Sequence, residues 1–135
     1  KLLHDRLAEK VVYDGSGTYA HSAYGALVQG KAVCDGYAKA FQTVLRRAGI
    51  QSFLITGSSV NPSTGAPEGH AWNAVRIDGK YYHVDVTWDD PVNDLNRDML
   101  LHEYFLKTRE EFNKIDSLNP KNKHVYDEAI YNFID

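Results

Sequence analysis

The chain has 135 residues, a formal net charge of −3 and 43% hydrophobic residues, which is typical of one soluble globular domain. The small charge excludes a strongly basic nucleic-acid-binding surface, and no apolar run approaches the roughly 18 residues of a membrane span. The single cysteine excludes an internal disulfide and a four-cysteine zinc site. Because the chain begins at Lys1 without an initiator Met or a signal-peptide pattern, we expect residues 1–135 to be one domain of a longer protein.

The first part of the chain predicts two helices separated by a glycine-rich loop. Apolar residues recur at helical spacing over residues 2–12, which predicts the first helix. Residues 14–17 form a loop by their composition. A second, short helix is expected over residues 22–28, with Ser22 at its start and Gly30 after its end.

The clearest helical pattern begins at Cys34. Apolar residues follow it with helical period as far as Ala48, and Gly49 is suited to end the helix. A thiol attacks as its thiolate, and a helix N-terminus stabilises negative charge, so Cys34 is a candidate nucleophile. The alternative is that Cys34, which shares the inward face with Tyr37, is simply a small buried apolar residue.

The middle of the chain predicts an antiparallel sheet. Residues 52–56 have the composition of a strand, whereas residues 57–69 are rich in glycine, serine and proline and predict a long loop. Two further strands are expected over residues 70–77 and 80–87. They are joined by Asp78-Gly79, which is the strongest short signal for a hairpin turn.

The remaining segments are less regular. The tail predicts a strand over residues 103–106 and a short helix over residues 109–114. The segment 58–69 directly precedes His70, so it either borders a substrate cleft or is a flexible connector. Together these elements predict an α+β fold in which a helix packs on a small antiparallel sheet.

The predicted hairpin turn brings a histidine and a carboxylate together. A two-residue turn at Asp78-Gly79 places His70 opposite Thr87 and Asp85 opposite Trp72, all on one face of the sheet. Asp85 is then a diagonal neighbour of His70, about 7–8 Å away between backbones and within side-chain reach. A carboxylate that accepts a hydrogen bond from one imidazole nitrogen leaves the other nitrogen free to act as a base.

Three other polar residues near this hairpin are weaker candidates. Asp89 would be a second diagonal neighbour of His70 only if the strand continued past Thr87, and the following Trp-Asp-Asp-Pro run argues against that. Asp90 falls on the opposite face of the sheet. His83 shares the face of His70 but lies further from the helix, so we expect it to have a structural role.

Three blocks of the sequence resemble the transglutaminase-like superfamily of cysteine enzymes. They are GKAVCDGYA at residues 30–38, GHAWN at 69–73 and YHVDVTW at 82–88, with a weaker likeness at 103–106. The likeness extends over about residues 20–91. Within the superfamily, the sequence most resembles a bacterial group related to kyphoscoliosis-type peptidases. It implies a papain-like or transglutaminase-like core with Cys34 as nucleophile, His70 as base and Asp85 as the residue that orients the histidine.

The resemblance leaves the oxyanion donor open. The animal cross-linking enzymes of this family use a tryptophan upstream of the cysteine, whereas Trp72 and Trp88 both lie downstream of Cys34. Donors would instead be the backbone N–H of Cys34 and a side chain, for which Tyr24 and Gln29 are candidates. Ordinary packing is an equal alternative for Tyr24. Trp72 either walls the substrate site or belongs to the core, and Trp88 is expected in the core.

The implied function is acyl transfer through a thioester, without a cofactor, on a protein or peptide amide. Water as acceptor would give a protease or deamidase, and a lysine amine would give a cross-link. The alternatives are a non-catalytic binding module on the same fold and a zinc site built from Cys34, His70 and either Asp85 or His83. The family resemblance alone suggests an extracellular or cell-surface location, and the oligomeric state stays open.

Overall fold

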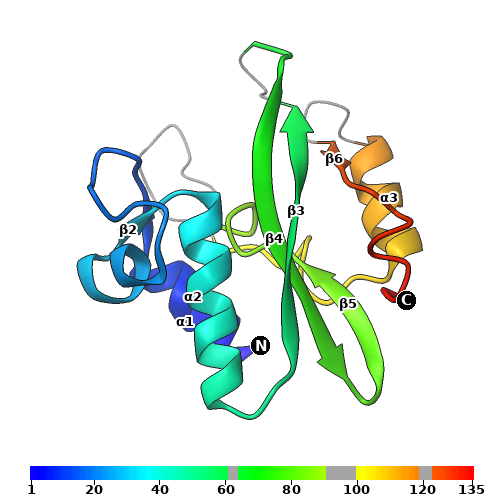
Figure 1. Ribbon diagram of the computed structural model, residues 1–135, viewed down its shortest axis with the longest axis horizontal. Helices are drawn as coiled ribbons and strands as arrows, with labels where there is room; N and C mark the ends of the chain where they lie inside the picture. The colour runs from blue at the N-terminus through cyan, green and yellow to red at the C-terminus, as the bar shows by residue number, and fades with distance from the viewer. Residues whose placement is uncertain (61–63, 91–99, 119–122) are drawn as a thin grey trace.

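The computed structural model describes residues 1–60, 64–90, 100–118 and 123–135. Its elements follow one another along the chain with these bounds: α1 (Leu2–Lys10), β1 (Val12–Tyr13), the π-helical turn η1 (Gly25–Gln29), β2 (Lys31–Ala32), α2 (Cys34–Arg47), β3 (Ser52–Val60), β4 (Pro67–Ile77), β5 (Lys80–Val84), α3 (Arg109–Leu118) and β6 (His124–Val125). Figure 1 shows them with these labels. No helix in the described ranges has the length and apolar character that a membrane crossing requires.

Four strands form the main sheet in the order β5-β4-β3-β6, and all their pairings are antiparallel. The predicted hairpin register is confirmed from Ile77, which pairs with Lys80, to Asn73, which pairs with Val84. The strand expected over residues 80–87 ends at Val84, where the chain enters a turn, so the expected pairs of His70 with Thr87 and of Trp72 with Asp85 do not form. The turn residues Asp78 and Gly79 have φ of 50° and 81°, the positive values that a tight two-residue hairpin turn requires. A separate pair of short strands, β1 and β2, is parallel and is not predicted by the sequence pattern.

The predicted long loop at residues 57–69 is wrong. Strand β3 continues to Val60 and β4 begins at Pro67, with Val60 paired to Pro67. Loop-like composition is outweighed here by cross-strand pairing along a long hairpin, since strand preference depends strongly on context. Residues 61–63 lie outside the described part of the chain.

Helix α2 confirms the amphipathic pattern that begins at Cys34. It buries Tyr37, Phe41 and Leu45 along one face. Gly49 has a φ of 75°, the left-handed conformation that commonly ends a helix. The Asn73 side chain of β4 donates a hydrogen bond to the carbonyl of Ala38 at 2.9 Å, which joins the helix to the sheet.

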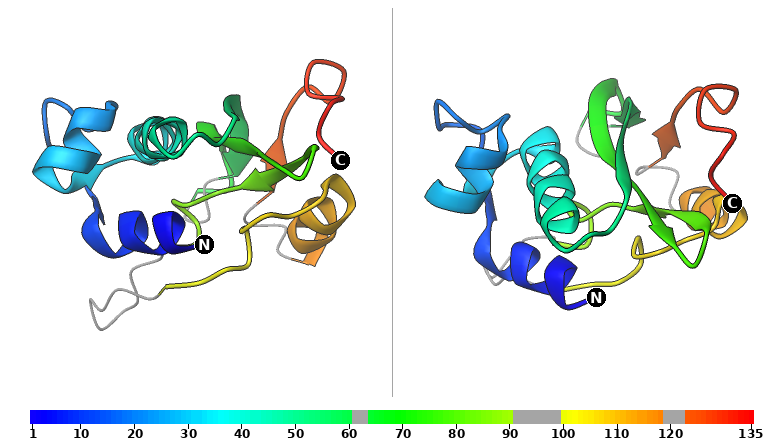
Figure 2. Two further views of the ribbon diagram at one scale, coloured as in Figure 1. Left: turned by 90° about the horizontal axis from the view of Figure 1, so that it is seen from below. Right: turned by 60° about the horizontal axis from the view of Figure 1, so that its bottom comes forward.

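The sheet separates two apolar clusters, because alternate residues of β4 point to opposite faces. Val75 belongs to a cluster with α1 and α2, whereas Trp72 and Ala74 belong to a largely aromatic cluster with α3. Figures 1 and 2 show α1 and α2 on one side of the sheet, and α3 with the C-terminal segment on the other. The α+β fold with a helix packed on an antiparallel sheet is therefore confirmed.

The boundaries of three other predicted elements differ from the structure. The first helix ends at Lys10 because Val11 has extended backbone angles that lead into β1. Residues 103–106 form turns and bends instead of a strand. Their backbone is held from the side, where the N–H of Asp85 donates to the carbonyl of Tyr104 at 2.9 Å. The predicted short helix at 109–114 is present and continues to Leu118.

Candidate functional site

Cys34 is the first residue of α2 and is partly exposed. The preceding segment lies unusually close to this end of the helix. A Cβ atom added to Gly36 would lie 2.4 Å from the carbonyl oxygen of Ala20, so only glycine fits there. The backbone N–H of Val33 donates to the same carbonyl at 3.0 Å. Gly36 therefore lets the segment around Ala20 pack closely against the first turn of α2.

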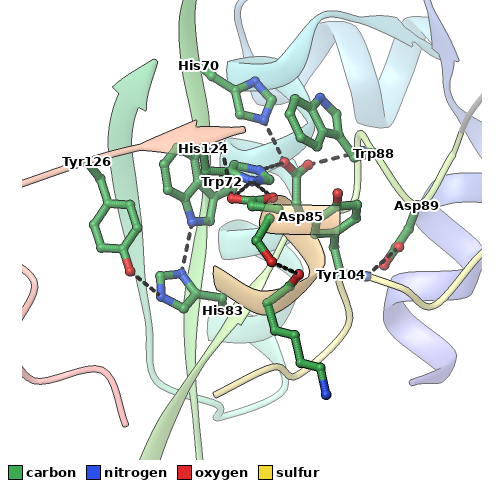
Figure 3. A network of polar contacts seen from close by, with 12 residues as sticks. His70, Trp72, His83, Asp85, Trp88, Asp89, Tyr104, His124 and Tyr126 are labelled. Atoms are coloured by element: carbon green, nitrogen blue, oxygen red, sulfur yellow. Dashed lines mark hydrogen bonds and ion pairs between the residues drawn. The ribbon is translucent and has the colours of Figure 1, made fainter. Parts of the chain in front are cut away.

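His70 and Asp85 meet as the hairpin register predicts. The Nε2 atom of His70 donates a hydrogen bond to Oδ2 of Asp85 at 2.6 Å, and both residues are buried (Figure 3). Asp85 directly follows β5, and its Oδ1 atom accepts a hydrogen bond from the backbone N–H of Trp88 at 3.1 Å. With Nε2 of His70 held by the carboxylate, Nδ1 is the ring nitrogen left for another partner.

Cys34 lines the same two hollows as His70 and contributes to the electrostatics of its ring. Burial lowers the pKa of His70, but the charge and hydrogen bond of Asp85, followed by the interaction with Cys34, outweigh it and raise the pKa to about 10. Burial raises the pKa of Asp85, yet His70 and then His124 hold it well below its ordinary value. The arrangement favours an imidazolium beside an ionised carboxylate, which is the setting that stabilises a thiolate.

A second histidine, His124 of β6, shares the same carboxylate. Its Nε2 atom lies 2.8 Å from Oδ2 of Asp85, and its Nδ1 atom lies 3.0 Å from both oxygens of Asp116 on α3. His124 has a fully buried side chain. Neither His124 nor Asp116 is predicted as a site residue by the sequence. His124 lies 39 positions after Asp85 in the chain, and no local pattern connects the two.

Two tryptophans surround the His70 ring. The ring centroids of Trp72 and Trp88 lie 5.5 Å and 5.0 Å from that of His70, in stacked orientations (Figure 3). Trp72 is only 1% exposed, so it supports His70 from within the core and has no surface for a substrate. Trp88, which the sequence predicts to lie in the core, is partly buried, packs against the aromatic cluster and also lines the cleft beside Cys34.

Two hollows meet at Cys34 and His70. The larger has a volume of about 580 Å³, and its lining includes Tyr13, Glu68 and Trp88. The smaller has a volume of about 350 Å³ and lies beside the start of α2, where Cys34 and Asp35 line it. The predicted border at residues 58–69 is present in part, since the larger cleft is lined by residues from both β3 and β4 in this range. Tyr13 is not predicted as a lining residue, because its strand has no recognisable sequence pattern.

The two side chains proposed as oxyanion donors are not brought to this site. Tyr24 is 51% exposed and packs against Tyr19, with ring centroids 5.0 Å apart. Gln29 is exposed, and its side-chain oxygen lies towards Gly17. Neither residue is among those that line the two hollows at Cys34. The backbone N–H of Cys34, at the first position of α2, has no acceptor within its own helix, which keeps it as a candidate donor.

The three weaker candidates of the hairpin have other contacts. His83 is buried, accepts a hydrogen bond from the Trp72 indole at 3.0 Å, and has a pKa lowered to about 3, first by burial and then by His124. Asp89 accepts from His4 at 2.9 Å, and Asp90 accepts from the hydroxyl of Tyr37 at 2.8 Å. Among the described residues, none of the three is hydrogen-bonded to His70. This agrees with a structural role for His83.

Two trios among the described residues have the ligand types of a metal site, namely His70 with Asp85 and His124, and His4 with Asp5 and His102. Tetrahedral zinc with bonds of about 2.0–2.2 Å would separate its ligand atoms by about 3.3–3.5 Å. Within the trios the nitrogen-to-oxygen distances are 2.6 and 2.8 Å, and 2.9 and 2.7 Å. These separations fit hydrogen bonds, so both trios are explained as they stand. Neither trio is one of the zinc sites considered from the sequence, which relied on Cys34.

The chain is similar to one protein family and to two named mammalian proteins. A family model described as the transglutaminase-like superfamily matches residues 1–86. The human and mouse proteins called kyphoscoliosis peptidase are 39% identical over 64 residues and 33% identical over 87 residues. These alignments cover 43% and 58% of this chain but only 10% and 13% of the relatives' lengths.

Solved structures show the same fold at low sequence identity. A structure from Cytophaga hutchinsonii, described as a candidate cysteine protease, is 24% identical with a TM-score of 0.55, and the match covers 74% of this chain and 33% of that one. A structure described as a TGase is 21% identical with a TM-score of 0.51, over 62% of this chain and 24% of that one. At these identities the likeness concerns the fold alone.

Proposed function

Because this chain belongs to the transglutaminase-like superfamily, we propose that it is an acyl-transfer enzyme with a cysteine nucleophile. Its substrates would be carboxamides of proteins or peptides, either a glutamine side chain or a peptide bond. The single observation that carries the proposal is the buried His70–Asp85 pair beside a partly exposed cysteine at a helix N-terminus. The sequence relatives named above are described as peptidases, which agrees with chemistry at an amide bond.

In this proposal each residue of the trio has one role. Cys34 attacks as a thiolate, which is stabilised by the imidazolium of His70 and by the N-terminus of α2. His70 donates and accepts the proton through Nδ1. Asp85 holds the ring through Nε2 and stabilises its protonated form.

The first half-reaction forms a thioester. The sulfur of Cys34 bonds to the amide carbon, and the carbonyl electron pair moves to oxygen. As this intermediate collapses, the carbon–nitrogen bond breaks, and His70 gives its proton to the departing amine. The backbone N–H of Cys34 is the proposed donor to the negative oxygen.

The second half-reaction transfers the acyl group to an acceptor. His70 takes a proton from water or from an amine, the acceptor bonds to the carbonyl carbon, and the carbon–sulfur bond breaks. The thiolate and the imidazolium are restored. Water as acceptor makes the enzyme a peptidase or deamidase, and a lysine amine makes it a transglutaminase. The two hollows that meet at Cys34 offer separate approaches for the acyl donor and the acceptor.

The test is the pH dependence of Cys34 alkylation by iodoacetamide in the wild type and in His70→Ala. We expect the wild-type thiol to react at pH values well below 8.5, which is about the ordinary pKa of a cysteine. The alkylation rate at pH 6 should be about 100-fold lower in the variant. The chain has no other cysteine, so the labelled site is unambiguous. A wild-type thiol that titrates near 8.5 would contradict the proposal and favour a non-catalytic binding module. Product analysis with glutamine peptides, with and without an amine, then separates hydrolysis from cross-linking.

A further inference from the structure

His124 is enclosed by carboxylates at both ring nitrogens. Its Nε2 atom lies 2.8 Å from Asp85 (Figure 3). Its Nδ1 atom lies 3.0 Å from each oxygen of Asp116. An ionised carboxylate can only accept hydrogen bonds, so each nitrogen needs its own proton. As long as both carboxylates are ionised, the two contacts require a proton on each nitrogen of this fully buried ring, which makes His124 an imidazolium.

This cation balances the charges beneath the proposed site. Asp85 and Asp116 are only 1% and 3% exposed, and two buried carboxylates without a counter-charge would be strongly destabilising. Asp85 also carries His70 on the same Oδ2 atom that His124 contacts. With Cys34 as a thiolate and His70 as an imidazolium, the five groups carry one net negative charge, whereas a neutral His124 would leave two.

The other described residues around His124 supply no second counter-ion. The titratable and charged side chains that face its ring from the packed elements are Asp85, Asp116, His70, His83 and Tyr104. His83 is neutral, because its lowered pKa of about 3 lies far below the neutral range. Both carboxylates therefore depend on the histidines, and Asp116 depends on His124.

The C-terminal segment brings His124 to this place. Strand β6 pairs with β3, and a Cβ atom added to Gly57 would lie 2.2 Å from the carbonyl oxygen of Val125. Only a glycine on β3 allows so close an approach. Asp116 also accepts a hydrogen bond from the backbone N–H of His124 at 2.9 Å. Both Asp116 and His124 lie beyond residues 1–86, the part that the family model matches.

We propose that His124 is a positioning residue, which Asp116 clamps and which keeps Asp85 ionised and in place under His70. The inference rests on the proposed function, because the role of His124 is exerted only through Asp85 and its partner His70. Without His124, Asp85 loses a donor and a positive neighbour, so it takes up a proton at a higher pH. The imidazolium of His70 then loses its counter-charge and stabilises the Cys34 thiolate less, so the thiol stays protonated up to a higher pH.

The experiment is the pH profile of Cys34 alkylation in His124→Gln. We expect the rate at pH 6 to fall about tenfold relative to wild type, with rates at pH 9 within about twofold, because the acid limb moves up by about one pH unit. His83→Gln is the matched control. It also removes a buried histidine of the same aromatic cluster, but one whose hydrogen bond is to Trp72 and not to Asp85. We expect its pH profile to keep the wild-type shape even if its thermal stability falls.

Two further measurements test the role of His124. If His124→Gln does not fold, Asp116→Asn removes the clamp but leaves His124 facing Asp85, and we expect a shift of the same sign and smaller size. Nitrogen-15 NMR of the wild-type imidazoles at pH 7 should show both His124 nitrogens protonated. A folded His124→Gln with an unchanged profile, or a singly protonated His124, would overturn the inference.

The outcomes also separate this inference from the proposed function. An unreactive wild-type thiol would contradict the proposed acyl-transfer function. The NMR measurement would still show whether His124 is doubly protonated. A reactive thiol with an unchanged His124→Gln profile leaves the function standing and removes only the role of His124.

Discussion

Two histidine–carboxylate networks lie next to each other in this protein and differ in what surrounds them. One is centred on Asp85, which accepts hydrogen bonds from His70 and His124. The other is centred on Asp89, which accepts from His4 at 2.9 Å. The two aspartates are joined by one turn of backbone, since the N–H of Asp89 donates to the carbonyl of Asp85 at 3.2 Å.

The two networks differ in the groups that surround them and in the pKa of the central aspartate. The Asp85 network adjoins the cleft that contains Cys34, and its histidines hold the pKa of Asp85 low against the effect of burial. The Asp89 network lies under α1, where His4 packs edge-on against Phe41, and burial raises the pKa of Asp89. A buried histidine–aspartate pair is therefore not a site by itself. The thiol and the cleft are what distinguish the first network from the second.

Removal of the thiol is the strongest test of this distinction. We expect Cys34→Ala to lower the catalysed rate by on the order of 10⁶-fold, because the nucleophile is lost. The side chain is partly exposed, so the variant should unfold at the wild-type temperature within a few degrees. Turnover of a peptide or glutamine substrate, measured beside a thermal melt, checks both statements. Wild-type turnover in the variant would end the assignment of Cys34.

The two aspartates offer a matched pair of substitutions. Asp85→Asn should lower the rate by about 10⁴-fold, because an amide cannot stabilise the imidazolium of His70. Asp89→Asn should leave the rate within about threefold while it weakens the contact with His4 and costs about 1–3 kcal/mol of stability. Steady-state kinetics and urea melts of both variants give the comparison. Equal losses of rate would show that the two networks do not differ in function.

The pH dependence of stability should belong to the first network. His70 has a folded-state pKa of about 10, above its ordinary 6.5. Its contribution is therefore complete below about pH 6.5 and is lost as the pH rises to about 10. Urea melts of His70→Gln should show a smaller alkaline loss of stability than the wild type. His4→Gln should retain the wild-type alkaline loss, and a flattened curve in that variant would contradict the comparison.

The smallest effect is expected at Gly57, the residue of β3 that allows β6 to approach closely. Gly57→Ala should push Val125 away and cost about 1–3 kcal/mol of stability, because its Cβ atom would lie 2.2 Å from a carbonyl oxygen. Gly69→Ala on β4 is the control, since a Cβ atom there meets no heavy atom of the described residues within 4 Å. Melting temperatures and Cys34 alkylation at pH 6 would be compared. A melting temperature of Gly57→Ala equal to that of Gly69→Ala would argue against close packing of β6.

Local patterns in the sequence determine much of the site. The apolar period after Cys34 predicts α2, and Asp78-Gly79 predicts the hairpin and its register. That register places Asp85 within reach of His70, and the structure shows their hydrogen bond. These predictions succeed because each feature depends on residues that are close in the chain. The catalytic roles of the three residues stay predictions until activity is measured.

Tertiary structure alone decides what lies around this trio. Residues 57–69 have the composition of a loop, yet most of them extend β3 and β4, because pairing between strands outweighs composition. Tyr13 reaches the cleft through a two-residue strand that is too short to leave a pattern. His124 reaches Asp85 from 39 positions away, through the packing of α3 and β6. Local patterns act over a few residues, whereas such long-range contacts exist only once the packed core brings distant segments together.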